Sequence, residues 1–369
     1  MPGSEAGAMS ALTVADGCDL LAERERPKYA LLRALAALGV YRVAHLGRIR
    51  APGGTDPFQR LAVEALTRDA VLEQRGGWRG RIIHREQYQG KTFEFMAGRG
   101  DEEPDAVVVP GRGLRERVLA ELPPRPRPVI ALDFSLIHRH SPEEARSLRV
   151  QVGAALGAVR RYLWDPHLLL AGLERGVLEW LRGFLASPYV ATTMLPADEG
   201  LTLRGYRRII LLDPSAEKPL TGREAKEADA FILGAIVDRT PRPGETSRLR
   251  LRGLYTPRRL ELRGSTHGVP NRINTLAEIL LRARYETCGN IEKAILASMS
   301  PRDARARAYV EISRWLRGRT TKVPWELYCR LRSWLPLTPR DFRRAARMAG
   351  AEVEPGEPHC ENTDHRRRG

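Results

Sequence analysis

The sequence predicts an α/β protein: a parallel sheet with helices on both faces, flanked by an α+β N-terminal domain and a helical C-terminal domain. Three short apolar runs, at residues 129–133, 208–213 and 231–238, each end in an acid. Runs of this length and character are typical of strands buried on both faces of a parallel sheet. A proline-rich linker at residues 123–128 precedes them, and an arginine-rich helical pattern follows from about residue 291. We therefore expect domains at residues 1–127, 128–290 and 291–369, the last with a disordered tail.

The composition points to an anionic partner. The 369 residues are 42% hydrophobic and carry a net charge of +16, which indicates a globular protein that meets a polyanion or an anionic surface. Only six of the 61 basic residues are lysines. A GC-rich genome or a thermophilic host explains that ratio but not the net charge. Arginine binds phosphate through two parallel hydrogen bonds and stacks on bases.

The cysteines and the N-terminus exclude several classes of protein. Cys18, Cys288, Cys329 and Cys360 lie far apart without a CxxC pair, which excludes a zinc ribbon and a thioredoxin-like motif. We expect no disulfide scaffold and a reducing cytoplasm, although disulfides do occur inside some hyperthermophiles. We also expect no metal. The first residues lack a signal-peptide pattern, and no stretch is apolar enough to span a membrane.

The N-terminal region reads as helices around a hairpin, after a lead-in of about 27 residues. A helix is expected over residues 30–38, and a second begins at Pro57 with Asp56 as its N-cap. Two strands, 81–87 and 91–96, form a hairpin that places Phe93 and Phe95 on one face. That pair either stacks on bases or, as is commoner, packs in the core. A strand at 105–109 and a helix at 112–122 complete this region.

The central region alternates strands with helices. Beyond the three apolar runs we expect short strands at 167–170 and 259–263. Capping boxes open two helices, at Ser141 and Thr221. Further helices are expected at 173–185 and 274–285, and a basic helix after Asp238. This alternation is typical of a parallel sheet covered on both sides.

The run at residues 231–238 carries the main candidate for chemistry. In open α/β sheets, ligands lie outside the carboxyl ends of the strands, so Asp238 projects where a ligand is expected. The alternative is a strand that simply stops at a solvated acid. Gly234 permits close approach of a neighbour or ligand. The sequence lacks GxxxxGK[ST], GxGxxG, HExxH and GxSxG motifs. His138-Arg139-His140 is either a basic loop near phosphate or a solvated turn.

The C-terminal region interleaves aromatic residues with arginines. We interpret it as a small helical domain with aromatics inside and arginines outside, on a face suited to phosphate. The tail from residue 352 is expected to be disordered. Its His359, Cys360, Asp364 and His365 offer metal-ligand chemistry, but a polar tail is the simpler interpretation.

Five segments together resemble the knotted (SPOUT) RNA methyltransferases, in the branch that methylates N1 of the purine at position 9 of tRNA. They are VIALDFSL (129–136), RRIILLD (207–213), FILGAIVDR (231–239), RRLELRG (258–264) and INTLAEILL (273–281). The resemblance covers roughly residues 128–290. It implies a trefoil knot, which is nearly absent from other folds, and S-adenosyl-L-methionine as cofactor.

The resemblance also assigns residues. Asp238 aligns with the proposed general base. The implied cofactor-binding residues are Leu212, Leu233, Gly234, Ile236, Leu262, Arg263, Gly264, Ile273, Asn274 and Thr275. The arginines that we expect to contact RNA are Arg239, Arg248, Arg250, Arg317 and Arg319. The partner is tRNA, and relatives in this branch act as monomers.

The chemistry of one carboxylate suits either purine. Guanine N1 carries a proton that a base removes, whereas methylated adenine becomes a cation that a carboxylate stabilises. We favour adenine because the C-terminal extension resembles archaeal relatives, some of which act on adenosine. The alternatives are a non-catalytic RNA-binding protein on the same fold and a knotted rRNA methyltransferase.

Overall fold

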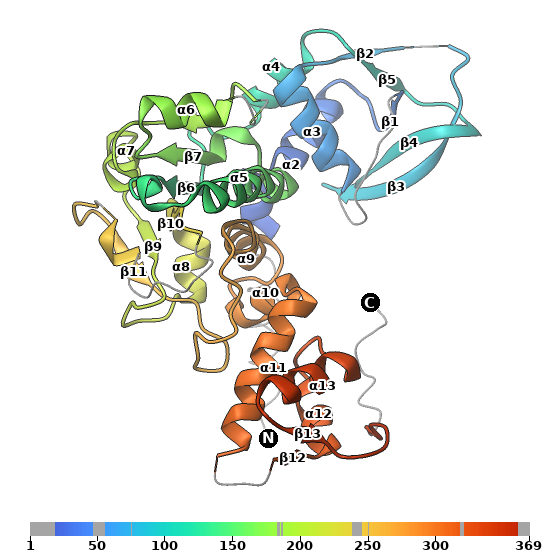
Figure 1. Cartoon of the computed structure of the whole chain (residues 1–369). Coiled ribbons are helices and arrows are strands. Elements are labelled where there is room, and N and C mark those ends of the chain that lie inside the picture. Colours follow the sequence, from blue (N-terminus) through green and yellow to red (C-terminus); the bar gives the residue numbers. More distant parts are fainter. Residues whose placement is uncertain are drawn as a thin grey trace, which may run out of the picture.

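The structure, a computed structural model, describes residues 19–46, 56–74, 76–182, 185, 187–237, 246–249, 251–317 and 321–360. Its larger buried clusters follow the chain in order (Figure 1). One lies within residues 30–118, two cover the faces of a sheet within residues 129–295, and one lies within residues 304–351. The domain limits drawn from the sequence stay a prediction.

The N-terminal part is a mixed five-stranded sheet that packs with helices α2, α3 and α4. Its strands run in the order β2-β5-β1-β4-β3, and β1 is parallel to both neighbours. The strands are β1 (Arg42–His45), β2 (Val71–Glu73), β3 (Gly80–Tyr88), β4 (Lys91–Glu102) and β5 (Ala106–Val109); the helices are α2 (Pro27–Ala37), α3 (Pro57–Arg68) and α4 (Leu114–Ala120).

Two expectations for this part are confirmed. Asp56 caps α3 by accepting hydrogen bonds from the backbone N–H groups of Phe58 and Gln59. Phe93 and Phe95 are each 1% exposed and meet Phe58 edge-on. The hairpin aromatics therefore belong to the core, and the base-stacking alternative is wrong.

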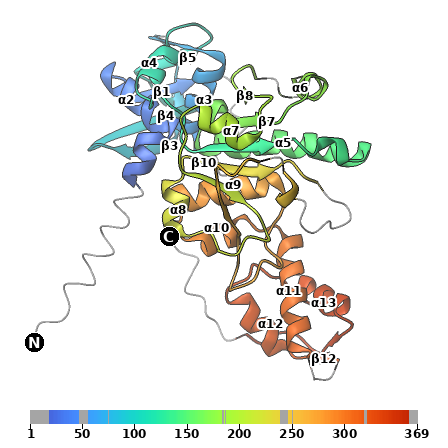
Figure 2. The same cartoon turned by 90° about the vertical axis from the view of Figure 1, so that its left-hand side faces the viewer.

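The central part is a six-stranded sheet in the order β11-β9-β10-β6-β7-β8. All five strand pairs are parallel, as the sequence predicts. The strands are β6 (Val129–Asp133), β7 (Leu168–Ala171), β8 (Ala191–Thr192), β9 (Ile209–Leu212), β10 (Ala230–Gly234) and β11 (Thr256–Arg258). Helices α5 (Pro142–Tyr162), α8 (Gly222–Glu227) and α9 (Ile273–Tyr285) cover one face, and α7 (Ala197–Leu203) lies on the other. Figure 2 shows this layering.

The predicted helix starts are present and the strand ends differ. Both capping boxes form, at Ser141 and Thr221, and α6 (Arg175–Arg182) lies within the expected helix. The strand expected at 231–238 ends at Gly234 instead. The last strand is β11, not residues 259–263. The basic helix expected after Asp238 falls partly outside the described residues; within them, Thr246–Arg248 form a 3₁₀ turn, η3.

The C-terminal part is helical, and its helices extend away from the sheet beyond α9 (Figures 1 and 2). They are α10 (Ile291–Ser298), α11 (Pro301–Trp315), α12 (Trp325–Arg332) and α13 (Pro339–Met348), with a small pairing of β12 (Lys322–Val323) and β13 (Glu352–Val353). Trp325 and Tyr328 lie in the core of this part, as predicted for its aromatics.

At the C-terminal end, the expected disordered tail from residue 352 and the expected lack of disulfides are both wrong. The chain from residue 352 is ordered into β13 and continues to Cys360 among the described residues. Cys360 forms a disulfide with Cys329 of α12, and Cys288 is disulfide-bonded as well. The sequence offered no local signal for the bond between Cys329 and Cys360, because these cysteines are 31 positions apart. Asp364 and His365 lie outside the described residues, and Cys360, as a disulfide, has no thiolate for a metal.

The segment before α2 packs into the central part rather than leading in freely. Ala22 belongs to the central cluster. Glu25 accepts hydrogen bonds from Nε and Nη2 of Arg284 at 2.8 and 2.7 Å, and from the Tyr285 hydroxyl at 2.7 Å. Glu25 thus fixes the segment just before α2 to α9. Among the described residues, none of the helices combines the length and apolar character that a bilayer crossing needs.

Candidate active site

Two of the three acids at strand ends have structural roles. Asp133 is buried, and its Oδ1 and Oδ2 accept hydrogen bonds from the backbone N–H groups of Ser135 and Ala197 at 2.9 and 2.8 Å. Asp213 Oδ1 accepts from the backbone N–H and the hydroxyl of Ser215 at 2.9 and 2.6 Å. Each carboxylate thus holds the turn after its own strand. Asp238, the third acid, lies outside the described residues.

Just after β10 the chain still contacts β6. Ala235 N–H donates to Asp133 O at 2.8 Å. A Cβ on Gly234 would lie 2.8 Å from Ile236 Cδ1 and 3.6 Å from Leu249 Cδ1. The close approach that Gly234 permits is therefore made by Ile236, and a larger residue would displace it.

His140 holds the residue that precedes Asp238. The Val237 N–H donates to His140 Nε2 at 3.0 Å, and His140 Nδ1 lies 3.3 Å from Ile137 O. This arrangement fits a neutral ring with its proton on Nδ1. The sequence indicated a turn here, and η1 (Ile137–Arg139) is one. The bond to Val237 was not predicted, because it joins residues 97 positions apart.

The structure brings four of the expected cofactor residues into one buried cluster. Leu212, Leu233, Leu262 and Ile273 all belong to the cluster on the α5–α9 side of the sheet. Strand pairing places the ends of these strands side by side. Gly234 of β10 lies opposite Asp133 of β6, and Leu212 of β9 lies opposite Arg258 of β11. Ile236 packs on the opposite face of the sheet.

A tight turn carries the next expected residues. Leu262 and Ser265 exchange backbone hydrogen bonds of 2.9 and 3.2 Å. Between them, Arg263 and Gly264 have φ angles of +48° and +68°, the pattern of a turn with two left-handed central residues. The Arg263 N–H donates to Glu292 Oε1 at 2.7 Å. No protein atom lies within 4 Å of a Cβ built on Gly264, so its backbone borders open space.

Arg307 and Trp334 of the C-terminal part contact this turn and the loop after it. We call Arg263, His267, Gly268, Arg307 and Trp334 the Trp334 clasp. Arg307 of α11 is 0% exposed, and its Nη1 donates to His267 O at 2.9 Å. The Arg263 and Arg307 guanidinium groups lie 4.1 and 5.6 Å from the Trp334 ring centre, within cation–π range.

Gly268 lets α11 approach the loop. A Cβ at this position would lie 2.7 Å from Arg307 Cα, and its φ of +76° is in the left-handed region. Burial lowers the pKa of Arg307, although Glu311 acts against it. Sequence reasoning missed the whole clasp, because it joins residues from two predicted domains.

Helix α9 places its first residues differently. The Ile273 N–H donates to Gln151 Oε1 of α5 at 3.1 Å, and Thr275 is 9% exposed. Asn274 instead lines an open groove between α3 and α5. The structure therefore separates Asn274 from the buried cluster, and its cofactor contact stays a prediction.

The expected RNA-binding arginines are mostly outside the described residues. Arg239, Arg250 and Arg319 are not described. Arg248 is exposed in η3, and Arg317 is exposed just after α11. Contacts of these five with RNA stay predictions.

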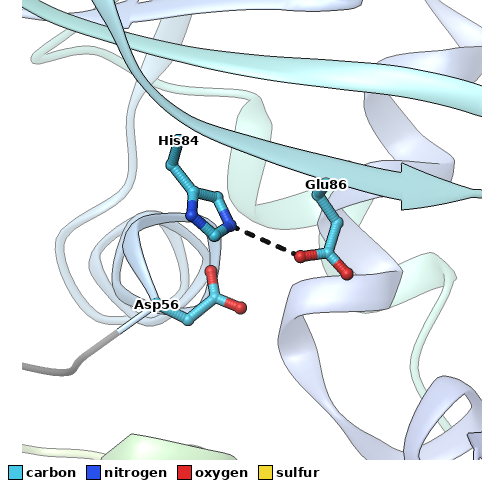
Figure 3. Close-up of side chains that lie close together, drawn as sticks. All are labelled: Asp56, His84 and Glu86. Atoms are coloured by element: carbon cyan, nitrogen blue, oxygen red, sulfur yellow. Dashed lines mark hydrogen bonds and ion pairs between the residues drawn. The ribbon is translucent and has the colours of Figure 1, made fainter. Parts of the chain in front are cut away.

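One side-chain cluster has metal-ligand composition but already holds a cation. Asp56, His84 and Glu86 point toward one another (Figure 3), with ligand atoms all within 4.8 Å of each other. Lys28 Nζ lies 2.8 Å from Asp56 and 2.9 Å from Glu86. Burial acts to lower the pKa of Lys28, but Asp56 and Glu86 outweigh it and the pKa is raised. The ammonium group serves as the counter-ion of this cluster, which we interpret as structural.

Comparisons with known proteins bear on the fold and its relatives. A protein 29% identical over 276 residues, 71% of this chain and 86% of its own length, is the tRNA (adenine(9)-N1)-methyltransferase of Sulfolobus acidocaldarius. Another, 29% identical over 234 residues, is the tRNA (guanine(9)-/adenine(9)-N1)-methyltransferase of Thermococcus kodakarensis; the match spans 60% of this chain and 62% of that protein. The chain is a homologue of these archaeal enzymes.

Solved structures agree on the fold. The crystal structure of Sulfolobus acidocaldarius Trm10 with S-adenosylhomocysteine superposes with a TM-score of 0.62 at 20% identity, over 88% of this chain and 99% of that one. A second structure of Trm10 from that organism gives 0.50 at 23% identity, over 73% and 97%. A sequence profile for the family described as protein arginine N-methyltransferase SFM1-like matches residues 191–267.

These findings confirm the resemblance to the position-9 methyltransferases and the predicted fold class. The similarity to Trm10 covers most of the chain, including parts where the sequence resemblance offered only size and charge. The trefoil knot and the individual cofactor contacts stay predictions.

Proposed function

We propose that the chain is an S-adenosyl-L-methionine-dependent methyltransferase that methylates N1 of the purine at position 9 of tRNA, with adenine favoured. The observation that carries the proposal is the homology to the Sulfolobus enzyme, which extends over 86% of that protein. The net charge of +16 suits a nucleic-acid substrate. Adenine is favoured because that homologue is named for adenine alone, while the Thermococcus homologue is named for both purines.

The residues at the expected cofactor site fit this cofactor. Leu212, Leu233, Leu262 and Ile273 form a buried apolar cluster, and a Cβ built on Gly264, two residues after Leu262, would meet open space. An adenine ring needs apolar contact and backbone hydrogen-bonding groups, and this turn offers both. When bound, the cofactor supplies an electrophilic methyl group on a sulfonium.

The transfer needs little beyond alignment and one carboxylate. The purine N1 forms a bond to the methyl carbon, and the sulfur keeps the electrons of the broken bond and becomes a neutral thioether. With guanine, Asp238 accepts the N1 proton. With adenine, the N1 lone pair attacks directly, and the Asp238 carboxylate stabilises the cation that forms.

His140 serves in this proposal as a positioning residue for Asp238. Its bond to the Val237 N–H fixes the backbone one residue before the carboxylate. We also propose that the protein acts as a monomer in the cytoplasm and without a metal. The monomer rests on the family resemblance, the cytoplasm on the scattered cysteines, and the lack of a metal on a transfer that requires none.

The family profile for protein arginine methyltransferases suggests a different acceptor. It matches 77 residues, 191–267, within the sheet region. The homology to the tRNA enzymes extends over 276 residues, so RNA is the better supported substrate. A non-catalytic RNA-binding protein and an rRNA methyltransferase are the other outcomes to separate.

The deciding experiment combines transfer and mapping. Purified protein, labelled S-adenosylmethionine and transcripts with A, G or U at position 9 are incubated, and reverse transcription then locates the arrest. We expect an arrest next to position 9, strongest with A and absent with U. Label in ribosomal RNA or an arginine peptide, but none in tRNA, would overturn the proposal. No calorimetric heat with S-adenosylmethionine would favour a non-catalytic protein.

Asp238→Asn tests the assigned carboxylate. We expect methyl transfer to fall by roughly 10²- to 10⁴-fold, the usual range for a general acid–base group. Affinity for tRNA, measured by fluorescence anisotropy, should stay within about twofold. Full turnover in this variant would contradict the role given to Asp238.

A further inference from the structure

An open groove lies where the N-terminal part meets the central part. One face of α3, one face of α5 and the start of α9 enclose about 540 Å³. Ala154, Gly157 and Ala158 of α5 line it with small side chains. No protein atom lies within 4 Å of a Cβ built on Gly157. The groove therefore exists because the residues of α5 that line it are small.

A buried amide fixes one end of the groove. Gln59 of α3 is 0% exposed, and its Nε2 donates to Arg160 O and Leu163 O at the end of α5. These carbonyls are at a helix C-terminus, where such groups lack helical partners. The Lys28 N–H donates to Gln59 Oε1 at 3.2 Å. The hydrogen bonds of Gln59 therefore hold α3 and α5 at a fixed separation along the groove.

The lining of the groove is rich in arginine. Its charged residues are Arg60, Glu64, Arg68, Arg160, Arg161 and Glu278, four cations and two anions. Both acids already have cationic partners. His45 lies 3.5 Å from Glu64 and holds the pKa of that carboxyl below its usual value. Arg282 Nη2 lies 2.9 Å from Glu278.

The four arginines differ in how their donors are used. Arg160 makes two hydrogen bonds of 2.6 Å to the buried Asp165, and Arg161 makes an exposed pair of 2.6 Å with Glu278. Arg60 Nη1 is buried without a hydrogen-bond partner. Arg68 is exposed at the end of α3, and within the described part of the chain it makes no hydrogen bond or ion pair.

A buried guanidinium nitrogen without an acceptor is costly to leave unsatisfied. An anion in the groove would be attracted by Arg60 and Arg68, which both line it. Arg161 can exchange its carboxylate for the same anion, because exposed ion pairs contribute little. The volume suits a ligand the size of one nucleotide. Asn274, which also lines the groove, directly follows Ile273 of the cofactor cluster.

We infer that this groove binds phosphate groups of the RNA backbone, through Arg60 and Arg68, while the target base lies at the methyl-transfer site. The inference rests on the proposed function and adds a subsite to it. Bound there, RNA contacts the N-terminal and central parts at once. The N-terminal part then contributes directly to substrate affinity.

The double variant Arg60→Gln/Arg68→Gln tests this subsite. Affinity for tRNA should fall by about tenfold, since two cationic side chains are lost and solvent screens each exposed contact with phosphate. The slope of log affinity against log salt should fall by about one to two, because fewer counterions are released. Affinity for S-adenosylmethionine and the melting temperature should match those of the wild type.

A matched control separates the groove from general charge. Arg117→Gln/Arg223→Gln removes the same charge from exposed positions on α4 and α8. The inference is overturned if both double variants lose equal tRNA affinity, or if neither loses any, while the wild type methylates tRNA. A wild type that transfers no methyl group, yet loses tRNA affinity only with the groove variant, would overturn the proposed function and support the groove.

Discussion

The arginines at two contacts between parts of this molecule have opposite environments. At the contact of the N-terminal segment with α9, Arg284 is 3% exposed and donates to both oxygens of Glu25 and to Ala225 O and Ala228 O. In the groove between α3 and α5, Arg60 has a buried nitrogen without an acceptor. The number of arginines therefore does not locate an RNA surface. Arg60 is distinguished by lining an open groove, since Arg307 also has buried nitrogens without a hydrogen-bond partner.

The Trp334 clasp resembles the contact between Glu25 and Arg284, because its buried arginine has partners within the protein. Arg307 donates to a backbone carbonyl and pairs with Glu311 at 2.7 Å. Closed contacts of this kind should govern stability and cofactor affinity, whereas the groove should govern RNA affinity. The substitutions below test that division, beginning with the largest effect.

Glu25→Ala should destabilise the protein most. The change leaves the Arg284 guanidinium buried without its carboxylate, and breaking a buried pair in this way costs about 3–5 kcal/mol. Thermal melting followed by circular dichroism measures the loss. Glu23→Ala, two residues earlier on the same segment, is the control and should shift melting little. Equal melting of the two variants would show that this contact is not essential.

Gly268→Ala should open the Trp334 clasp. The new Cβ would lie 2.7 Å from Arg307 Cα, and overpacking costs about 1–3 kcal/mol beyond the roughly 1–2 kcal/mol of a left-handed alanine. Affinity for S-adenosylmethionine should fall too, because the clasp holds the turn at 262–265. Gly253→Ala is the control, since its φ is +91° with nothing within 4 Å. If Gly253→Ala costs as much, the clash with α11 has no role.

Acid should lower the stability of the folded protein through protonation of the buried His167. Burial lowers the pKa of His167 from 6.5 to about 4, with Arg284 adding to the effect and a bond to Pro128 O opposing it. Because the folded-state pKa lies below the unfolded one, the stabilisation is complete above about pH 6.5. It is lost as the pH falls toward 4, by roughly 2–3 kcal/mol. Melting at pH 7 and pH 4 should diverge less in His167→Gln than in the wild type.

The sequence predicted features that depend on local signals. Asp56, Ser141 and Thr221 cap helices because each cap needs only the following three residues. The parallel sheet followed from short apolar runs, since both of its faces are covered. The family resemblance then identified four residues that do meet in one cluster.

Features that depend on distant partners could not be predicted. The end of β10 at Gly234 is set by packing of Ile236 and Leu249 and by the His140 bond, none of which local apolarity reports. The Arg284, Arg307 and Arg60 side chains belong to the same residue type, and only their neighbours distinguish them. Because they depend on distant neighbours, neither the Trp334 clasp nor the groove could be predicted from the sequence.

The bond between Cys329 and Cys360 affects how this protein should be handled at the bench. It closes a loop across 31 positions, and such closures contribute about 3–4 kcal/mol in the chain-entropy account. Buffers for RNA enzymes commonly contain dithiothreitol, which would open the ring and release the end of the chain from α12. Activity and melting data collected with reductant would then describe a looser C-terminal part than the one described above.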